Sequence, residues 1–147
     1  MNRLTSLLII IVVGLIPFPF LSVYAQAMQD PDIDITSPNN YDHVPMGDLS
    51  VHGTSSDDAA SFCEVGVILN KDTPYQNATA LGEGGQDDYS EWSYTITPSY
   101  TNIEEGLNEI ASRIVCYENG VNASSWSTVN VTGDPSLHQP GSNLTQG

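Results

Sequence analysis

The sequence predicts an all-β protein, an antiparallel sandwich of seven short strands around one hydrophobic core. Three observations predict it. Short runs of alternating apolar and polar residues recur along the chain, and clusters of Gly, Pro, Asn, Asp and Ser separate them. No segment between these runs has a helical period. The two cysteines, Cys63 and Cys116, each stand within such an alternating run, as residues on one face of a strand do.

The predicted strands follow one another with short connections. The run over 63–69 is the clearest and the run over 75–81 is the weakest. The acidic stretch over 101–109 is not assigned to a helix, because Gly106 interrupts it. Asn119-Gly120 predicts a turn, in a loop longer than a tight hairpin. The seven strands are expected at residues 33–36, 49–54, 63–69, 75–81, 92–96, 107–117 and 125–132.

Both cysteines are expected to point into the core. The apolar residues that share their parity are Val65, Val67 and Leu69 for Cys63, and Ile110 and Ile114 for Cys116. Two cysteines in an exported chain most often pair, and the loop closed here contributes about 4 kcal/mol in the chain-entropy model. Two buried free thiols are the alternative. A catalytic cysteine is not favoured, because no histidine has an obvious partnering role and neither thiol is expected to be exposed.

Residues 1–27 are predicted to be a signal peptide. A basic start at Arg3, an apolar run over 7–21 and small residues at Ala25 and Ala27 have the form of a Sec-type signal. The alternative is an uncleaved anchor, but the run is shorter than the roughly 20 apolar residues that span a bilayer. Membrane contact is therefore expected only through this segment, if it is uncleaved. The remaining organisation is predicted as one domain over 28–133 and a disordered tail over 134–147.

The charge is strongly acidic. All 18 acidic residues follow the predicted signal, against only Lys71 and Arg113, so this part of the chain carries a formal charge of −16. Such a surface repels phosphate backbones, and nucleic acid is excluded as a partner. Because of the predicted signal peptide and the two cysteines, this acidic protein is expected to be secreted or to lie at the cell surface.

Several short segments occur in a characteristic order. They are Ile35-Thr36-Ser37-Pro38, Leu49-x-Val51-x-Gly53-Thr54-x-x-Asp57, Glu64-Val65-x-Val67, Trp92-x-Tyr94 and Gly106-x-Asn108-x-Ile110. In this order they resemble the bacterial-type Ig-like domains of secreted and cell-surface proteins. The closer resemblance is to small exported Ig-like proteins of ammonia-oxidising archaea, in which Pro74-Tyr75-Gln76, Asp88-Tyr89-Ser90 and the two cysteines recur. The resemblance spans residues 33 to 133.

This resemblance implies a seven-stranded Ig-like sandwich used for adhesion, spacing or surface display, with no catalytic residues. Antibody domains place the first cysteine on the second strand, whereas Cys63 begins what should be the third. A bridge from Cys63 to Cys116 is therefore implied to join neighbouring strands of one sheet. Because the chain has one copy of the domain and many Ig-like surface proteins have several, a small binding or matrix protein is favoured over a stalk.

Four Asn-x-Ser/Thr sequons are candidate glycosylation sites. They are Asn77, Asn122, Asn130 and Asn143. Archaeal and eukaryotic hosts glycosylate such sites in exported chains. Chance also produces these triplets readily in a chain rich in Asn, Ser and Thr.

No metal site, cofactor or catalytic residue is expected. His43, His52 and His138 lack the spacing of zinc ligands, and no histidine follows Cys116 closely enough for a blue-copper site. Loop acids such as Asp57 and Asp58 suggest calcium, but solvated carboxylates are the default and no EF-hand loop occurs. The adjacent Glu104 and Glu105 cannot flank a cleft as a glycosidase pair does.

The aromatic residues leave the binding surface open. Trp92 and Tyr94 are expected in the core, whereas Tyr75, Tyr89, Tyr100 and Trp126 lie in or near loops. Exposed aromatics would stack on sugars or anchor a partner, but packing at a corner or an edge is favoured. The sequence thus predicts a non-enzymatic adhesion or binding module with a protein or glycan partner. The alternative is a self-associating component of the cell envelope or extracellular matrix.

Overall fold

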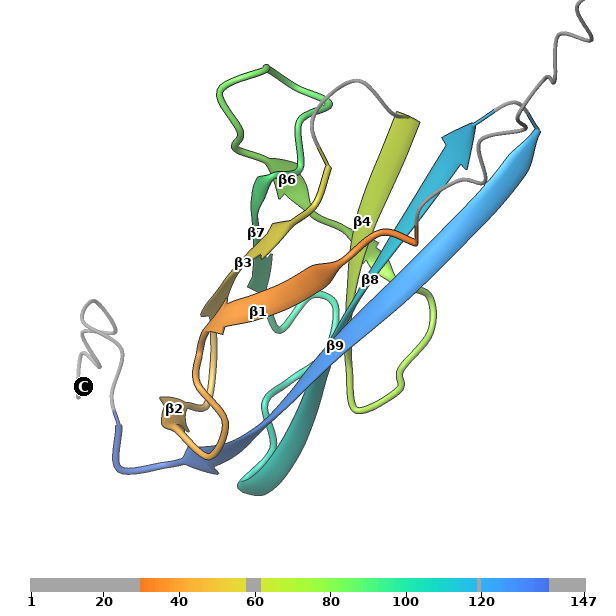
Figure 1. Ribbon diagram of the computed structural model, residues 1–147. Coiled ribbons are helices and arrows are strands. Elements are labelled where there is room, and N and C mark those ends of the chain that lie inside the picture. The colour runs from red at the N-terminus through yellow and green to blue at the C-terminus, as the bar shows by residue number, and fades with distance from the viewer. Residues whose placement is uncertain (1–29, 58–61, 119, 138–147) are drawn as a thin grey trace, which may run out of the picture.

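The computed structural model describes residues 30–57, 62–118 and 120–137. Over these residues the chain forms nine strands and no helix, in two sheets that share one core (Figure 1). The predicted all-β sandwich is confirmed, but with nine strands instead of seven. The strands are β1 (Ile33–Ser37), β2 (His43–Pro45), β3 (Leu49–Ser55), β4 (Phe62–Leu69), β5 (Gln76–Asn77), β6 (Thr79–Ala80), β7 (Glu91–Ile96), β8 (Gly106–Glu118) and β9 (Val121–Asp134).

The predicted ends of the chain fall partly outside this structure. The signal segment over 1–27 and residues 138–147 of the predicted tail lie outside the described residues. Asp134, the first residue assigned to the tail, is the last residue of β9. The described ranges contain no helix that is long and apolar enough to cross a membrane.

The four-stranded sheet has the order β1-β3-β7-β6, with every neighbouring pair antiparallel. On β3, Leu49, Val51 and Gly53 are buried and the residues between them are exposed, as in a sheet that covers a core on one side. Gly53 lies opposite Trp92 of β7. A Cβ at Gly53 would stand only 2.0 Å from Cζ2 of Trp92, so the missing side chain makes room for the buried indole.

The five-stranded sheet has the order β2-β9-β8-β4-β5. Its centre is the long hairpin of β8 and β9, which runs the length of the molecule in Figure 1. Pairing continues from Gly106 opposite Gly133 to Glu118 opposite Val121, so only residues 119 and 120 form the loop. The expectation of a longer loop is therefore wrong. Gly120 has φ of +80°, the left-handed conformation that two-residue hairpin turns require.

Two further differences account for the extra strands. Residues 75–81 do not form one strand: Gln76–Asn77 pairs with β4, and Thr79–Ala80 pairs with β7 in the other sheet. Between them Ala78 is buried, and its N–H donates to the carbonyl of Val65 at 2.9 Å. The segment thus crosses from one sheet to the other. The short strand β2 was not predicted, because three residues parallel to the end of β9 carry no readable alternation.

The cysteine pairing is confirmed. Cys63 of β4 lies directly opposite Cys116 of β8, the two form a disulfide, and their Cα atoms are 4.0 Å apart. Both residues are buried in the hydrophobic core. The bond joins neighbouring strands of the five-stranded sheet, as the family resemblance implied. A core disulfide indicates an oxidising environment outside the cytosol.

Most sheet edges are short or covered, but β2 pairs only with residues 132–134 of β9, so the rest of the outer side of β9 has no strand partner in the described chain. At the outer ends of the five-stranded sheet, β2 has three residues and β5 has two, and β6 at one end of the other sheet has two. The remaining edge strand, β1, packs beside β9, and the N–H of Ile35 donates to the hydroxyl of Ser127 at 3.3 Å. Short and covered edges give another chain little backbone with which to pair.

One buried amide fixes the approach to β8. Asn108 is buried, and its side-chain oxygen accepts from the N–H of Glu104 at 2.9 Å and from the side-chain amide of Asn70 at 3.0 Å. Its side-chain nitrogen donates to the carbonyls of Glu104 and Gly106. These four bonds tie the loop before β8 to the end of β4.

Candidate binding surface on the five-stranded sheet

The alternation along β4, β8 and β9 sends one set of side chains to solvent. On β8 the buried residues are at even positions from 108 to 116, so Arg113, Val115 and Tyr117 point away from the core. The strand register sets Tyr117 beside Phe62 of β4, and Arg113 between Gly66 of β4 and Trp126 of β9. We call this surface the outer face; it comprises Phe62, Glu64, Gly66, Arg113, Val115, Tyr117 and Trp126, with Tyr75 lying over Gly66.

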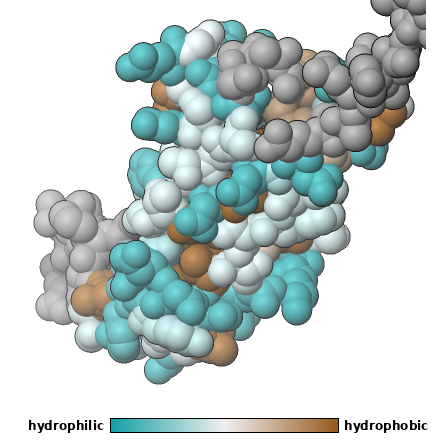
Figure 2. Space-filling model, viewed as in Figure 1, coloured by the Kyte–Doolittle hydropathy of each residue, from teal (hydrophilic) through white to brown (hydrophobic). Residues whose placement is uncertain are grey.

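Three large aromatic side chains are exposed on the outer face. Phe62, Tyr117 and Trp126 have 60, 42 and 57 % of their surface open to solvent. The ring centroids of Phe62 and Tyr117 are 6.0 Å apart, a normal separation for interacting rings. The surface seen in Figure 2 is mostly hydrophilic or near neutral, with hydrophobic residues in small separate areas. Exposed aromatic side chains gathered on one sheet face are typical of interaction sites.

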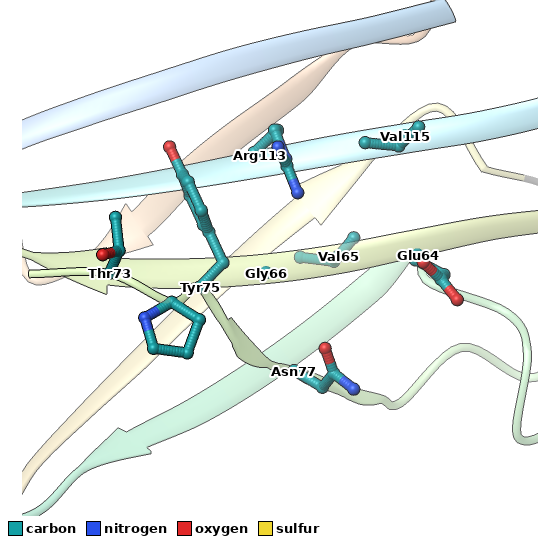
Figure 3. Close-up of a pocket in the computed structure, with 9 residues that line it drawn as sticks. Glu64, Val65, Gly66, Thr73, Tyr75, Asn77, Arg113 and Val115 are labelled. Carbon is teal, nitrogen blue, oxygen red and sulfur yellow. The ribbon is translucent and has the colours of Figure 1, made fainter. Parts of the chain in front are cut away.

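Tyr75 and Arg113 form a stacked pair beside these rings. Gly66 lets Tyr75 lie close to the sheet, because the Cβ of Tyr75 is 3.1 Å from the position that a Gly66 Cβ would take. The guanidinium carbon of Arg113 lies 4.5 Å from the centroid of the Tyr75 ring (Figure 3). At this distance the ring face attracts the cation, with a free energy of about 0.5–1 kcal/mol at an exposed site.

A hollow of about 340 Å³ opens beside this pair. Its walls include Glu64, Asn77, Tyr75 and Arg113, so it offers an acid, an amide, an aromatic face and a cation (Figure 3). The Nε of Arg113 is buried and has no hydrogen-bond partner in the described part of the chain. A buried donor without a partner costs about 1–3 kcal/mol. An acceptor placed in this hollow would recover that free energy.

The other aromatic residues take structural positions. Trp92 is buried in the core as predicted, and Tyr94 and Tyr89 are partly buried against it. Tyr100 also packs against the core, and its hydroxyl donates to the carbonyl of Asp72, which confirms its predicted place at a corner. Burial raises the pKa of the Tyr100 hydroxyl above its ordinary value. Trp126 is different, because it stands within β9 and not near a loop.

The sequons differ in how open they are. Asn77 on β5 and Asn122 on β9 are exposed, whereas Asn130 is half buried in β9. The backbone N–H of Asn130 donates to the side-chain oxygen of Asn40 at 2.7 Å. Asn143 lies outside the described residues. Glycosylation itself stays a prediction at all four sites.

The acids of the suggested calcium loops are used within the fold. Asp57 is buried and accepts the N–H of Tyr89 at 2.9 Å. Asp88 accepts the N–H groups of Gly84 and Ser90, and hydrogen bonds from Ser90, then from Gly84, lower the pKa of its carboxyl. In the parts of the chain that the structure describes, no three His, Cys, Asp or Glu side chains come together as a metal site. Asp58 lies outside those parts.

The remaining candidates are dispersed. His43 and His52 are exposed as predicted; His43 contacts Asp134 at 3.2 Å, and His138 lies outside the described residues. Glu104 and Glu105 are both exposed in the loop before β8.

Sequence reasoning did not single out Arg113, the residue with the most informative surroundings. It treated Arg113 only as one of two positive charges. The alternation along the strand could have identified it. Arg113 lies between the buried Ser112 and Ile114, so its side chain points away from the core on the same side as that of Tyr117. The contribution of Tyr75 could not be read in this way, because Tyr75 lies in the connection before β5.

Comparisons with known proteins add a distant structural match. No family model and no curated protein sequence matches the chain. One solved structure that matches is an X-ray structure of the endo-beta-1,4-mannanase from Thermotoga petrophila, with a TM-score of 0.47 and 12 % sequence identity. The match covers 76 % of this chain and 22 % of that one, so the chain spans about a fifth of the length of the mannanase chain.

Proposed function

We propose that this protein is an exported, non-enzymatic Ig-like module that binds a partner at the cell surface through the outer face. The observation that carries the proposal is the group of exposed aromatic side chains on that face, Phe62, Tyr117 and Trp126. The residues that contribute most binding free energy at protein interfaces are enriched in Trp and Tyr. The face lies on three strands of a disulfide-linked sheet, which holds the rings in place before binding.

The Ig-like assignment is part of this proposal. It is supported by the order of strands, with β1-β3-β7-β6 in one sheet and β2-β9-β8-β4-β5 in the other. The first edge segment is divided between the sheets as β1 and β2, and the segment over 76–80 is divided in the same way. Export through the segment over 1–27 is proposed with it, as is glycosylation of at least one sequon other than Asn77, whose side chain lines the hollow. The core disulfide agrees with export.

The alternative is a component of the envelope or matrix that self-associates. Pairing at β1, β5 and β6 is not favoured, because these edge strands are short or covered, but most of the outer side of β9 has no strand partner in the described chain. The formal charge of −16 beyond residue 27 also opposes contact between copies. Self-association would use the outer face or the outer side of β9, and the experiment below tests the outer face.

The test measures binding of the purified chain to a cell-envelope fraction from its own host. The test variant replaces the three exposed rings of the outer face by serine. A matched control replaces three exposed apolar residues elsewhere on the surface by serine. The test variant is Phe62→Ser, Tyr117→Ser and Trp126→Ser, and the control is Met46→Ser, Leu81→Ser and Leu137→Ser.

We expect the test variant to bind at least tenfold more weakly and the control to bind as the wild type does, with both still folded by circular dichroism. A tenfold loss corresponds to about 1.4 kcal/mol, which one buried ring can supply. Equal binding by the test variant and the wild type would refute the proposal. Analytical ultracentrifugation decides on the alternative: a wild-type dimer that the test variant converts to monomer would favour self-association.

A further inference from the structure

Arg113 is one of two Lys and Arg side chains that the structure describes in a very acidic protein. The described residues include two basic side chains, Lys71 and Arg113, and the Nζ of Lys71 lies 3.6 Å from a carboxylate oxygen of Glu109. Arg113 makes no ion pair with any described residue, although the chain carries 18 acids. Its positive charge on the outer face is thus left for something outside the domain.

The stacking on Tyr75 prepares Arg113 for a planar acid. The donors of a guanidinium lie in its plane, so a ring packed against its face leaves the donor edges open. A carboxylate matches this fork with two parallel hydrogen bonds. The Nε of that fork is buried and lacks a partner among the described residues, so a carboxylate that pairs with it requires a small movement of the side chain.

The other residues that line the hollow fit a ligand that is neutral and rich in hydroxyl groups apart from its carboxylate. The carboxylate of Glu64 and the amide of Asn77 line the same space as Arg113 (Figure 3). Glu64 accepts hydrogen bonds from hydroxyl groups and repels a second negative charge, while Asn77 both donates and accepts. Trp126, beside Arg113 on β9, supplies an exposed flat surface for an apolar ring face. The volume of about 340 Å³ is at the small end of ligand sites.

We propose that this hollow binds a sugar that bears a single carboxylate, such as a uronic acid residue of a glycan, with the carboxylate on Arg113. The inference rests on the proposed function, because it names the ligand class of the same face. A polyanion does not fit, because Arg113 is the one positively charged side chain among the residues that line the hollow and the protein around it is strongly acidic. A protein carboxyl terminus would also satisfy Arg113, and its backbone groups would bond to Glu64 and Asn77. The sugar is favoured because the exposed Trp126 beside Arg113 offers a flat surface for a sugar ring.

The test is a titration of the full exported chain, produced in a host that adds no N-glycans so that Asn77 is bare. The probes are glucuronate, glucose, acetate and N-acetylglycylglycine. Nuclear magnetic resonance follows the Nε–H signal of Arg113 and the indole N–H signal of Trp126. The variants are Arg113→Gln and Arg113→Lys, with Lys71→Gln as the matched control because it removes the other cation.

We expect saturable binding of glucuronate in the millimolar range, with glucose and acetate at least tenfold weaker. Arg113→Gln should weaken glucuronate binding at least tenfold, and Arg113→Lys should weaken it several-fold because lysine keeps the charge but not the fork. Lys71→Gln should bind as the wild type does. These variants should keep the wild-type circular dichroism spectrum.

Three results would each overturn the inference: absence of glucuronate binding, equal binding of glucose and glucuronate, or unchanged binding by Arg113→Gln. Stronger binding of the peptide than of glucuronate would also overturn it, in favour of a protein terminus. If any of these occurs while the triple serine variant of the outer face still loses envelope binding, the inference fails and the proposed function stands.

Discussion

Removing the disulfide is the sharpest test of how this fold is held together. The perturbation is the double variant Cys63→Ala, Cys116→Ala, which deletes the bond and leaves no free thiol. The two cysteines are 53 residues apart in sequence, and in the chain-entropy model a loop of that length is worth about 4 kcal/mol. The stability of small domains is about 5–15 kcal/mol, so this loss is a large part of the total.

The assay is equilibrium unfolding in urea at neutral pH, followed by the fluorescence of the buried Trp92. We expect the free energy of unfolding to fall by about 3–4 kcal/mol and the m-value to rise, because the unfolded chain without the crosslink exposes more surface. The melting temperature should fall by roughly 15–30 °C, at about 4–8 °C per kcal/mol for a domain of this size.

Reduction provides the control for this prediction. The wild type in excess reductant should unfold as the double variant does, and reductant should leave the double variant unchanged. A loss below about 1 kcal/mol would refute the reasoning, because it would mean that the bond closes no loop that costs entropy in the unfolded chain.

Three further predictions concern single residues. Gly53→Ala should cost about 3 kcal/mol of unfolding free energy in the same urea assay, because the added Cβ would stand 2.0 Å from an atom of Trp92. Asn108→Leu should also cost about 3 kcal/mol, since it leaves the loop groups that Asn108 bonds without partners. Asp88→Asn should destabilise at pH 7, and the effect should shrink as the pH falls below 3.8: hydrogen bonds from Ser90 lower the pKa of Asp88, so its contribution is fully present above 3.8 and is lost as the pH falls through the lowered value.

Each of these variants has an exposed neighbour as its control. Ser50→Ala on the same strand as Gly53, Asn102→Leu in the loop before β8 and Asp87→Asn beside Asp88 should each change stability by less than about 0.5 kcal/mol. A mild effect of Gly53→Ala would mean that the indole can move aside. A loss for Asp88→Asn that stays constant as the pH is lowered progressively below 3.8 would show that its carboxylate charge does not stabilise the fold.

Much of the fold could be read from alternation alone. The parity of Cys63 and Cys116 predicted that both sulfurs lie in the core, and Val129 and Val131 are buried as expected. The strands over 33–37, 49–55, 62–69 and 91–96 lie within about one residue of their predicted bounds. These agree because a strand half buried in a sandwich must alternate, and alternation is a local property of the sequence.

The strand with which each segment pairs could not be predicted from alternation. Residues 75–81 have one run of strand-forming residues, but Ala78 is where the chain leaves one sheet for the other. The strand β2 has too few residues to show a period, and its place beside β9 depends on the parallel approach of distant segments. Which sheet a short segment joins is decided by the shape of the assembled core, and no local pattern records it.

The sequence by itself determined that this is an acidic, all-β chain with two core-facing cysteines, because composition and alternation are carried by each segment separately. Only the tertiary structure decided where the surface chemistry gathers. Arg113, Tyr75 and Trp126 come from three separate segments, and they meet because strand register and the bare Gly66 bring them to one face. Register is a relation between strands, so the candidate binding site exists only once the sheet has formed.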